Sequence, residues 1–258
     1  MITTLLVTYA LVLLSLTVVG YLIPAGVFHW LIYIRQEPSV VAGRIQARRH
    51  RPEDIRREVR DSMISLLLFS AYSVALFKAY EGGLTSIYWD VTHYPLWWIP
   101  ASFIAAMLLH DTYFYWTHRL MHTELLFKHF HAGHHRSLTP TPWAILSFQP
   151  LETVFQFGFF ALLVVLVPMH PAVLLAYFLF DGLINAAGHC GHEIVPRSYR
   201  DHPLLRFTNA MTHHDLHHSR FNYNFGQYFN FWDRLMGTFL DRPAIAADLS
   251  ARADRSAS

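Results

Sequence analysis

The 258-residue chain is 53% hydrophobic and only 15% charged, with a mean hydropathy of +0.24. Soluble domains carry about 25% charged residues, so this composition indicates an integral membrane protein. The net charge of +2 and the lack of a basic stripe argue against a nucleic-acid partner. The single cysteine, Cys190, excludes an internal disulfide.

The first predicted element is a membrane-spanning helix over residues 2–34. This stretch is almost wholly apolar, interrupted by small hydroxyl residues, Pro24 and His29, and it exceeds the roughly 20 residues that a spanning helix needs. The chain starts Met-Ile-Thr-Thr, without the basic residues that open a signal peptide. We therefore expect the helix to be retained.

An arginine-rich segment follows, from residue 35 to residue 60. Its eight arginines are Arg35, Arg44, Arg48, Arg49, Arg51, Arg56, Arg57 and Arg60. The positive-inside rule places this segment in the cytoplasm, and an anionic-lipid patch is compatible with the same placement. Residues 81–94 contain no lysine or arginine, as expected for a loop on the other side.

Four further apolar stretches predict spans at 62–80, 95–116, 151–167 and 172–185. The predicted fold is an all-α integral membrane bundle of about four to five transmembrane helices with a cytoplasmic, histidine-rich helical cap. Residues 1–94 hold the first spans and the arginine-rich loop, residues 95–241 the catalytic domain, and residues 242–258 a flexible tail. Five crossings would bring all the histidine clusters to the cytoplasmic face of a bacterial inner membrane or an endoplasmic reticulum membrane.

Histidines recur at the spacing of one helix face. A first pair is four residues apart, and two later triplets stand at i, i+3 and i+4: His118 and His122; His131, His134 and His135; His214, His217 and His218. Independent structural roles do not explain this repeat, so the pattern predicts a metal centre. Imidazole suits Zn, Cu, Fe and Ni. A single four-coordinate zinc would leave ligands unused, so two metals are the simpler interpretation.

These motifs carry a family resemblance. The run His-Asp-Thr-Tyr-Phe-Tyr-Trp-Thr-His-Arg-Leu-Met-His at 110–122, followed by His-Ala-Gly-His-His at 131–135, resembles the fatty acid hydroxylase and sterol desaturase superfamily of membrane di-iron proteins. Further matches stand in family order at 141–143, 150–152, 188–193, 213–218 and 232–238. The resemblance covers about residues 95–239.

The resemblance implies two iron ions and a set of histidine ligands. These are His118, His122, His131, His134, His135, His189, His214, His217 and His218, with His192 as a tenth. His213 and His110 are further candidates, the first beside a ligand and the second two turns before one. Zinc binds nitrogen ligands more tightly than Fe(II), so a purified sample could carry zinc in an iron site.

Several polar residues are candidates for orienting these ligands, because a ligating histidine usually gives its other N–H to a carboxylate or carbonyl. The carboxylates near the clusters are Asp111, Glu193, Asp215 and Asp233. Asp181 and Asn185 lie in a predicted span, where polar groups are costly and often functional. For Asp181, a hydrogen bond between helices is an equal alternative.

The activity implied by the resemblance is that of an oxygenase. A diferrous centre would take up O2 and two external electrons and remove hydrogen from a lipid, giving an alcohol or an alkene. Sterol, fatty acyl, sphingolipid, ornithine lipid and carotenoid substrates all remain open. The chain has no dinucleotide fingerprint and no haem-binding domain, so a separate electron donor is expected, such as a cytochrome b5 or a ferredoxin.

Two other classes of protein use clustered histidines. A membrane metal transporter would place histidines and acids along several spans. A zinc-dependent hydrolase would need an open three-ligand site with a nearby general base. Nine histidines gathered at one predicted membrane edge argue against both alternatives.

Overall fold

A bundle of long helical segments forms most of the molecule. The computed structural model describes residues 2–46 and 48–241, in which β-type pairing is limited to three isolated bridges. The long elements are α1 (Ile2–Ser15), which continues through η1 (Leu16–Leu22), α2 (Ile23–His29) and η2 (Trp30–Ile34), and then α4 (Pro52–Glu81), α5 (Trp98–Met121), α7 (Pro150–Leu166) and α8 (Pro171–Gly188). The predicted all-α fold is confirmed.

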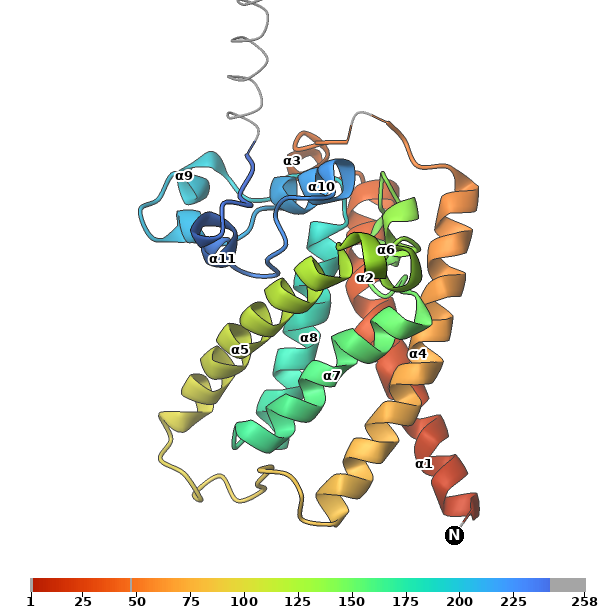
Figure 1. The fold of residues 1–258 in the computed structure, drawn as a ribbon, viewed down its shortest axis with the longest axis vertical. Helices are drawn as coiled ribbons and strands as arrows, with labels where there is room; N and C mark the ends of the chain where they lie inside the picture. Colours follow the sequence, from red (N-terminus) through yellow and green to blue (C-terminus); the bar gives the residue numbers. More distant parts are fainter. Residues whose placement is uncertain (1, 47, 242–258) are drawn as a thin grey trace, which may run out of the picture.

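Short elements gather at the end of the bundle opposite the N-terminus and form a cap (Figure 1). They are α3 (Pro38–Val41), α6 (Glu124–Phe130), η3 (His134–Arg136), η4 (Pro142–Ala144), α9 (Arg197–Arg200), η5 (Leu205–Phe207), α10 (Met211–Arg220) and α11 (Phe231–Leu235). The predicted tail at 242–258 lies outside the described residues.

Three segments are long and apolar enough to cross a membrane, namely Ile2–Ile34, Pro52–Glu81 and Pro171–Gly188. Large apolar side chains on the first segment face outward, with Ile2 72% and Leu11 61% exposed. Such a surface needs lipid rather than water around it. The protein is therefore a multi-pass membrane protein. The number of crossings and the side of the membrane that holds the cap stay predictions.

Proline sets the start of several helices. Pro52, Pro150 and Pro171 each stand at a first helical position, where the missing N–H has no intrahelical partner to lose. The 30-residue α4 ends at Glu81 with Gly82 as its C-cap, and Gly83 follows with φ +71°, a conformation that suits glycine. Helices α4 and α7 thus begin at the cap and run away from it. Their first turns border the histidine segments.

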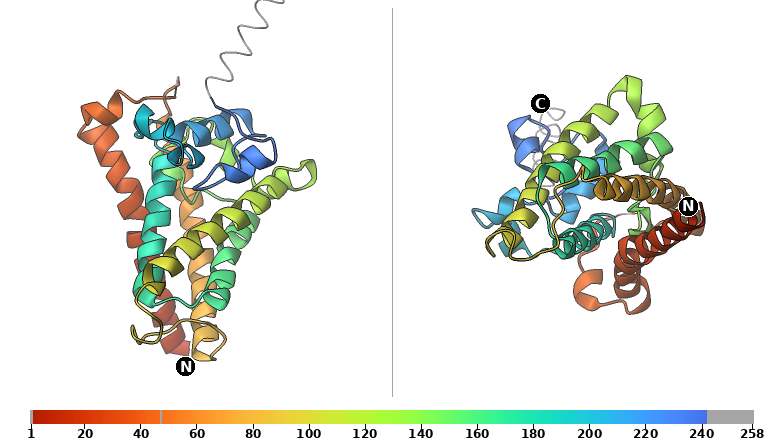
Figure 2. Two further views of the ribbon diagram at one scale, coloured as in Figure 1. Left: turned by 90° about the vertical axis from the view of Figure 1, so that its left-hand side faces the viewer. Right: turned by 90° about the horizontal axis from the view of Figure 1, so that it is seen from below.

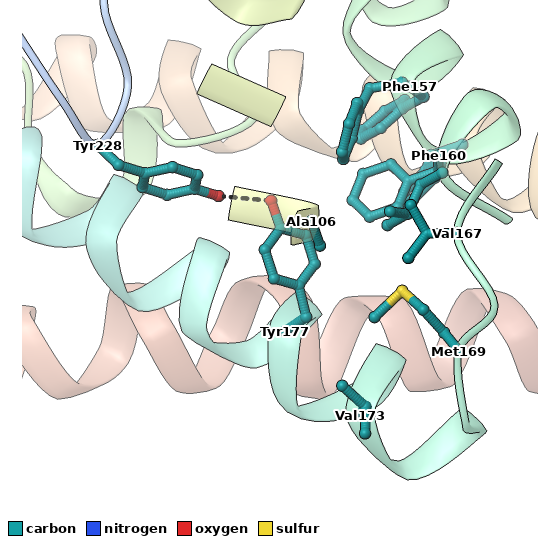
Figure 3. Packing of buried hydrophobic residues seen from close by; sticks show 11 residues of the cluster. Ala106, Phe157, Phe160, Val167, Met169, Val173, Tyr177 and Tyr228 are labelled. Carbon is teal, nitrogen blue, oxygen red and sulfur yellow. Dashed lines mark hydrogen bonds between the residues drawn. The ribbon is translucent and has the colours of Figure 1, made fainter. Parts of the chain in front are cut away.

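Helices α4, α5, α7 and α8 run through the bundle (Figure 2), and the apolar core lies between them (Figure 3). The rings of Phe69 and Phe157 stack with centroids 3.5 Å apart, and Leu163 and Tyr177 are fully buried beside them. Tyr228, from the cap, shares a hydrogen bond of 3.0 Å between its hydroxyl and that of Tyr177. The core therefore continues from the bundle into the cap and ties the two together.

The local structure at the first histidine triplet differs from the expected helix. Helix α6 ends at Phe130, His131 is its C-cap residue, and His134 begins the 3-10 turn η3. Gly133 lies close to Gln149, the N-cap residue of α7: a Cβ on Gly133 would come within 2.6 Å of the Gln149 side chain, so this close approach requires glycine. The second triplet lies on one helix, α10, as predicted.

Candidate metal centre

Nine histidines converge at the boundary between the bundle and the cap, in two groups. The first group is His118, His122, His131, His135 and His217; the second is His134, His189, His214 and His218. In each group, one ring nitrogen of every residue lies within 4.8 Å of those of all the others. The structure thus brings together the nine histidines that the family resemblance implied as ligands.

The two groups are interleaved along the chain. His134 and His135 are neighbours in sequence yet belong to different groups, and so are His217 and His218. Successive residues on a helix point about 100° apart, so a short helix placed between two sites can serve both. The rings of His135 and His218, from different groups, have centroids only 4.9 Å apart. Two ions bound here would be close neighbours.

Backbone carbonyls determine the tautomer of several rings. The Nδ1 atoms lie at 3.0 Å from the Phe225 oxygen for His118, 3.3 Å from the Ser147 oxygen for His134, 2.8 Å from the Asn185 oxygen for His189 and 2.7 Å from the Tyr223 oxygen for His217. A carbonyl only accepts, so each Nδ1 carries the hydrogen. In the neutral ring, Nε2 is then left with a lone pair.

Those lone pairs face one another. The Nε2 atoms of His134 and His189 are 3.3 Å apart, and neither has a hydrogen to donate when both rings are neutral. Such an arrangement is repulsive unless a cation lies between the nitrogens. Two nitrogens bound at right angles, each about 2.1 Å from one ion, would be separated by about 3.0 Å. The donor set therefore fits metal ions better than a hydrogen-bonded histidine cluster.

Burial keeps the rings neutral. Removal from water lowers the pKa of His134, His135, His217 and His218 well below 6.5, and neighbouring imidazoles lower it further. A metal ion competes with protons for the same lone pair, so rings that stay unprotonated at neutral pH are ready to coordinate.

The strongest contact behind the ligands involves a residue to which the sequence analysis assigned no role. Glu152, in the first turn of α7, accepts a hydrogen bond of 2.6 Å from Nδ1 of His131. Its side chain is fully buried, and its second oxygen, Oε2, has no hydrogen-bond partner in the described structure. A carboxylate in this position orients the imidazole and raises its basicity as a ligand. The available signal was an acid two residues after the proline that opens an apolar helix.

Comparison with known proteins agrees with this geometry. A family model described as fatty acid hydroxylase matches residues 103–238, just over half of the chain. The chain belongs to the fatty acid hydroxylase family. This confirms the resemblance inferred from the histidine motifs, and it makes the chain a histidine-rich membrane oxidoreductase of that family.

The names of several curated relatives of this chain refer to sterols. Lathosterol oxidase of Rattus norvegicus is 34% identical over 72% of the chain and 61% of its own length, and that of Homo sapiens is 32% identical over the same shares. Delta(7)-sterol 5(6)-desaturase ERG3B of Gibberella zeae is 30% identical over 71% of the chain and 55% of its own length. The chain thus spans about three fifths of the length of the first two relatives. No solved structure matches it.

Two of the candidate carboxylates, Asp111 and Asp233, bind the backbone of the segment 225–229, which contacts His118. Asp111 accepts hydrogen bonds from the backbone N–H groups of residues 227–229, at 2.7 to 3.1 Å. Asp233 accepts from the N–H groups of Phe225 and Gly226, both at 2.9 Å. The carbonyl of Phe225 in turn accepts from His118. Asp111 and Asp233 therefore fix the segment whose Phe225 carbonyl orients the candidate ligand His118.

The other candidates lie on or beside α8 and α10. Glu193 accepts from the backbone N–H of Thr212 at 3.2 Å and from its hydroxyl at 2.7 Å, which fixes the start of α10. Asn185 contributes its backbone carbonyl to His189, while its side chain donates to Asp181 at 3.2 Å. Asp215 lies on α10 and lines a hollow at the outer side of the cap.

Three candidate histidines lie outside both groups. Nδ1 of His192 donates to the carbonyl of Cys190 at 2.8 Å, and Nδ1 of His213 accepts from the backbone N–H of Ala210 at 3.0 Å. His110 lies deeper in the bundle, where its Nδ1 is 2.7 Å from the hydroxyl of Tyr177. The assignment of His192 as a metal ligand has no geometric support from either group.

A buried acid from α4 fixes the loop that follows η3. Glu58 is fully buried and accepts hydrogen bonds from the hydroxyls of Ser137, at 2.8 Å, and Thr141. These two residues close the loop that begins with His134 and His135. Glu58 precedes the region that the family model matches, and as one of four acids in the arginine-rich segment it gave no signal of this role.

The lowered histidine pKa values predict acid sensitivity of the metal-free protein. Below about pH 6.5 the histidines bind protons in the unfolded chain but stay neutral when buried in the folded protein. The free energy of unfolding therefore falls as pH decreases. Going from about pH 7.5 to 5.5 should cost about 1.4 kcal/mol for each ring that stays neutral. Thermal unfolding in detergent at the two pH values measures the loss; an unchanged midpoint would contradict the prediction.

Proposed function

We propose that this protein is a di-iron oxidoreductase that uses O2 and two electrons from a separate donor to hydroxylate or desaturate a C–H bond of a membrane lipid. The single observation that carries the proposal is the pair of adjacent, buried, all-histidine groups. Zinc has no redox chemistry, whereas iron bound by histidines can activate O2. Membership of an oxidoreductase family supports iron as the functional metal.

The protein's own residues would bind, orient and shield this centre. The first group offers five imidazoles and the second offers four. Glu152 and four backbone carbonyls hold Nδ1 atoms and leave Nε2 atoms directed at the ions. His118, His134 and His217 are at most 4% exposed, so the packing of the cap over the bundle excludes water. When bound, the irons would supply the oxidising power for attack on an unactivated C–H bond.

The donor set argues against a zinc-dependent hydrolase. A catalytic zinc has three protein ligands and an open position, with a base placed to activate the bound water. The two groups here offer four and five nitrogens. Glu152 lies behind His131, on the ring edge turned away from the shared nitrogens, so it is placed to orient a ligand.

A sterol-like lipid is the first substrate class to test. The relatives are named lathosterol oxidase and Delta(7)-sterol 5(6)-desaturase, at about one third identity. A polycyclic apolar substrate would reach the centre from the membrane, in which the bundle lies. Fatty acyl lipids are the alternative that the family description itself suggests.

The reducing equivalents would come from a separate carrier such as a cytochrome b5 or a ferredoxin. Two electrons and two protons balance the reaction: hydroxylation converts one oxygen atom of O2 to water, and desaturation converts both. We place the centre on the cytoplasmic side, where such carriers and the arginine-rich segment would meet. The positive-inside rule supports this orientation.

Lipid mass spectrometry tests the function directly. Lipids of a strain that lacks the gene are compared with those of the strain restored with wild type or with His134→Ala, after growth with added iron. We expect wild type alone to produce an O2-dependent lipid species shifted by one oxygen or by two hydrogens. Two irons per chain in the purified wild type, with no lipid differing between wild type and His134→Ala, would overturn the proposal.

A further inference from the structure

A basic basin lies beside the cap and takes no part in the metal centre. Three neighbouring hollows share walls there, of about 450, 450 and 300 Å³. Arg48 lines all three. We call this surface the arginine basin, and its cationic residues are Arg44, Arg48, Arg49, Arg51, Arg136 and Arg220.

The positive charge of the basin is only partly balanced within the protein. Arg51 pairs with Glu53 and Asp54, Arg136 pairs with Asp61, and Asp54 and Asp215 are the carboxylates in its walls. Among the described residues, no carboxylate lies within ion-pair distance of the guanidinium groups of Arg44, Arg48 or Arg49. Arg44 instead donates to the backbone carbonyl of Arg48 at 3.3 Å. Like charges gathered around a concave surface repel one another, and an anion bound between them would relieve this repulsion.

The basin is framed by backbone pairing with the cap. The backbone N–H of Ile45 donates to the Gly191 carbonyl at 3.0 Å, and that of Glu193 donates to the Gly43 carbonyl at 2.7 Å. This pairing sets His192 beside Arg44, and both line the first hollow together with Arg48 and Arg49. His192, one of the three candidate histidines outside both metal groups, therefore lines the basin.

The position of the first hollow indicates where its ligand comes from. Ile32 and Tyr33, at the end of the membrane segment Ile2–Ile34, form part of its wall. The end of a spanning helix lies at the level of the lipid headgroups, where basic pockets between helices take up anionic lipids. The hollow thus offers an apolar edge toward the membrane and guanidinium groups above it.

We propose that the arginine basin binds the phosphate headgroup of an anionic membrane lipid. Arg48 and Arg49 supply charge, and the guanidinium fork matches phosphate oxygens in pairs. A concave hollow of this size suits a headgroup, whereas an acidic carrier protein would need about 800 Å² of complementary surface on each partner. This inference does not depend on the proposed oxidoreductase function.

The test uses the full chain in nanodiscs of phosphatidylcholine with increasing phosphatidylglycerol. Lipid retained after gentle extraction is quantified by native mass spectrometry for wild type, the double variant Arg48→Gln/Arg49→Gln, and the control Arg56→Gln/Lys128→Gln. The control removes the same charge from exposed residues that line none of the hollows. We expect phosphatidylglycerol affinity to fall about 30-fold in the basin variant and to stay close to wild type in the control.

Each other outcome overturns the proposal. Equal losses in the two variants would show unspecific attraction to the surface, and equal retention of the two lipids by wild type would remove the headgroup site. Inorganic phosphate that displaces phosphatidylglycerol at equal concentration would assign the basin to soluble anions. An acidic carrier protein that binds wild type in its place, and not the basin variant, would make the basin a protein interface. Unchanged metal content and thermal midpoint show that the variants are folded.

Discussion

His189→Ala is expected to reduce the metal content to about one ion per chain and to lower activity by more than about 100-fold. His189 is central to the four-histidine group: its Nε2 lies 3.3 Å from that of His134 and 3.0 Å from that of His214. Its removal leaves three imidazoles around one ion position, while the five-histidine group keeps all its ligands. Metal content after iron-supplemented expression, measured by mass spectrometry, checks the stoichiometry.

His122→Ala is the matched control, because it removes one imidazole from the group of five. Four nitrogens would remain there, and His122 is only partly buried, whereas His189 is 2% exposed. We expect this variant to keep close to two ions and to lose less activity. Equal loss of metal from both variants would contradict the division of the histidines into a group of four and a group of five.

Glu152→Gln should lower metal affinity at the five-histidine group by about 10- to 100-fold, with activity falling alongside it. The carboxylate holds the Nδ1–H of His131 and brings a negative charge to a site that would hold two dications. Glutamine keeps the shape of the side chain but removes the charge. Chelator competition followed over a range of pH measures the change, because a weaker ligand releases its metal at a higher pH.

Glu124→Gln provides the comparison for Glu152. Glu124 is an exposed acid at the start of α6, seven residues before His131, so its charge is screened by water. This variant should bind metal as wild type does. Glu152→Asp should recover part of the lost affinity, since the charge returns on a shorter side chain. If Glu152→Gln retains metal as tightly as wild type, Glu152 has no role in holding the centre.

The candidate ligands could be predicted from the sequence, whereas their partners could not. Histidines at a repeated local spacing are visible in a single chain, and nine of the ten predicted ligands lie in the two groups. The carbonyl of Phe225 is 107 residues from the His118 ring that it orients. No local pattern marks one carbonyl among many as the acceptor, so contacts of this kind appear only when the chain is folded.

His192 shows the limit of motif reasoning. It stands within a family motif, three residues after His189, yet its ring lines the arginine basin. The turn at Gly191, with φ +70°, redirects the chain between the two histidines. The resemblance assigned both histidines to one site, but α8 ends at Gly188, before either of them.

The sequence by itself determined the membrane class, the helical fold and the histidines that gather in two groups, because hydropathy, helical periodicity and imidazole clusters are properties of local stretches. Tertiary structure alone decided that His134 and His135 serve different groups, that Glu152 stands behind His131, and that the arginines border the cap. Those features depend on the direction in which each side chain points once distant helices pack. Packing directions come from long-range contacts, which no local pattern encodes.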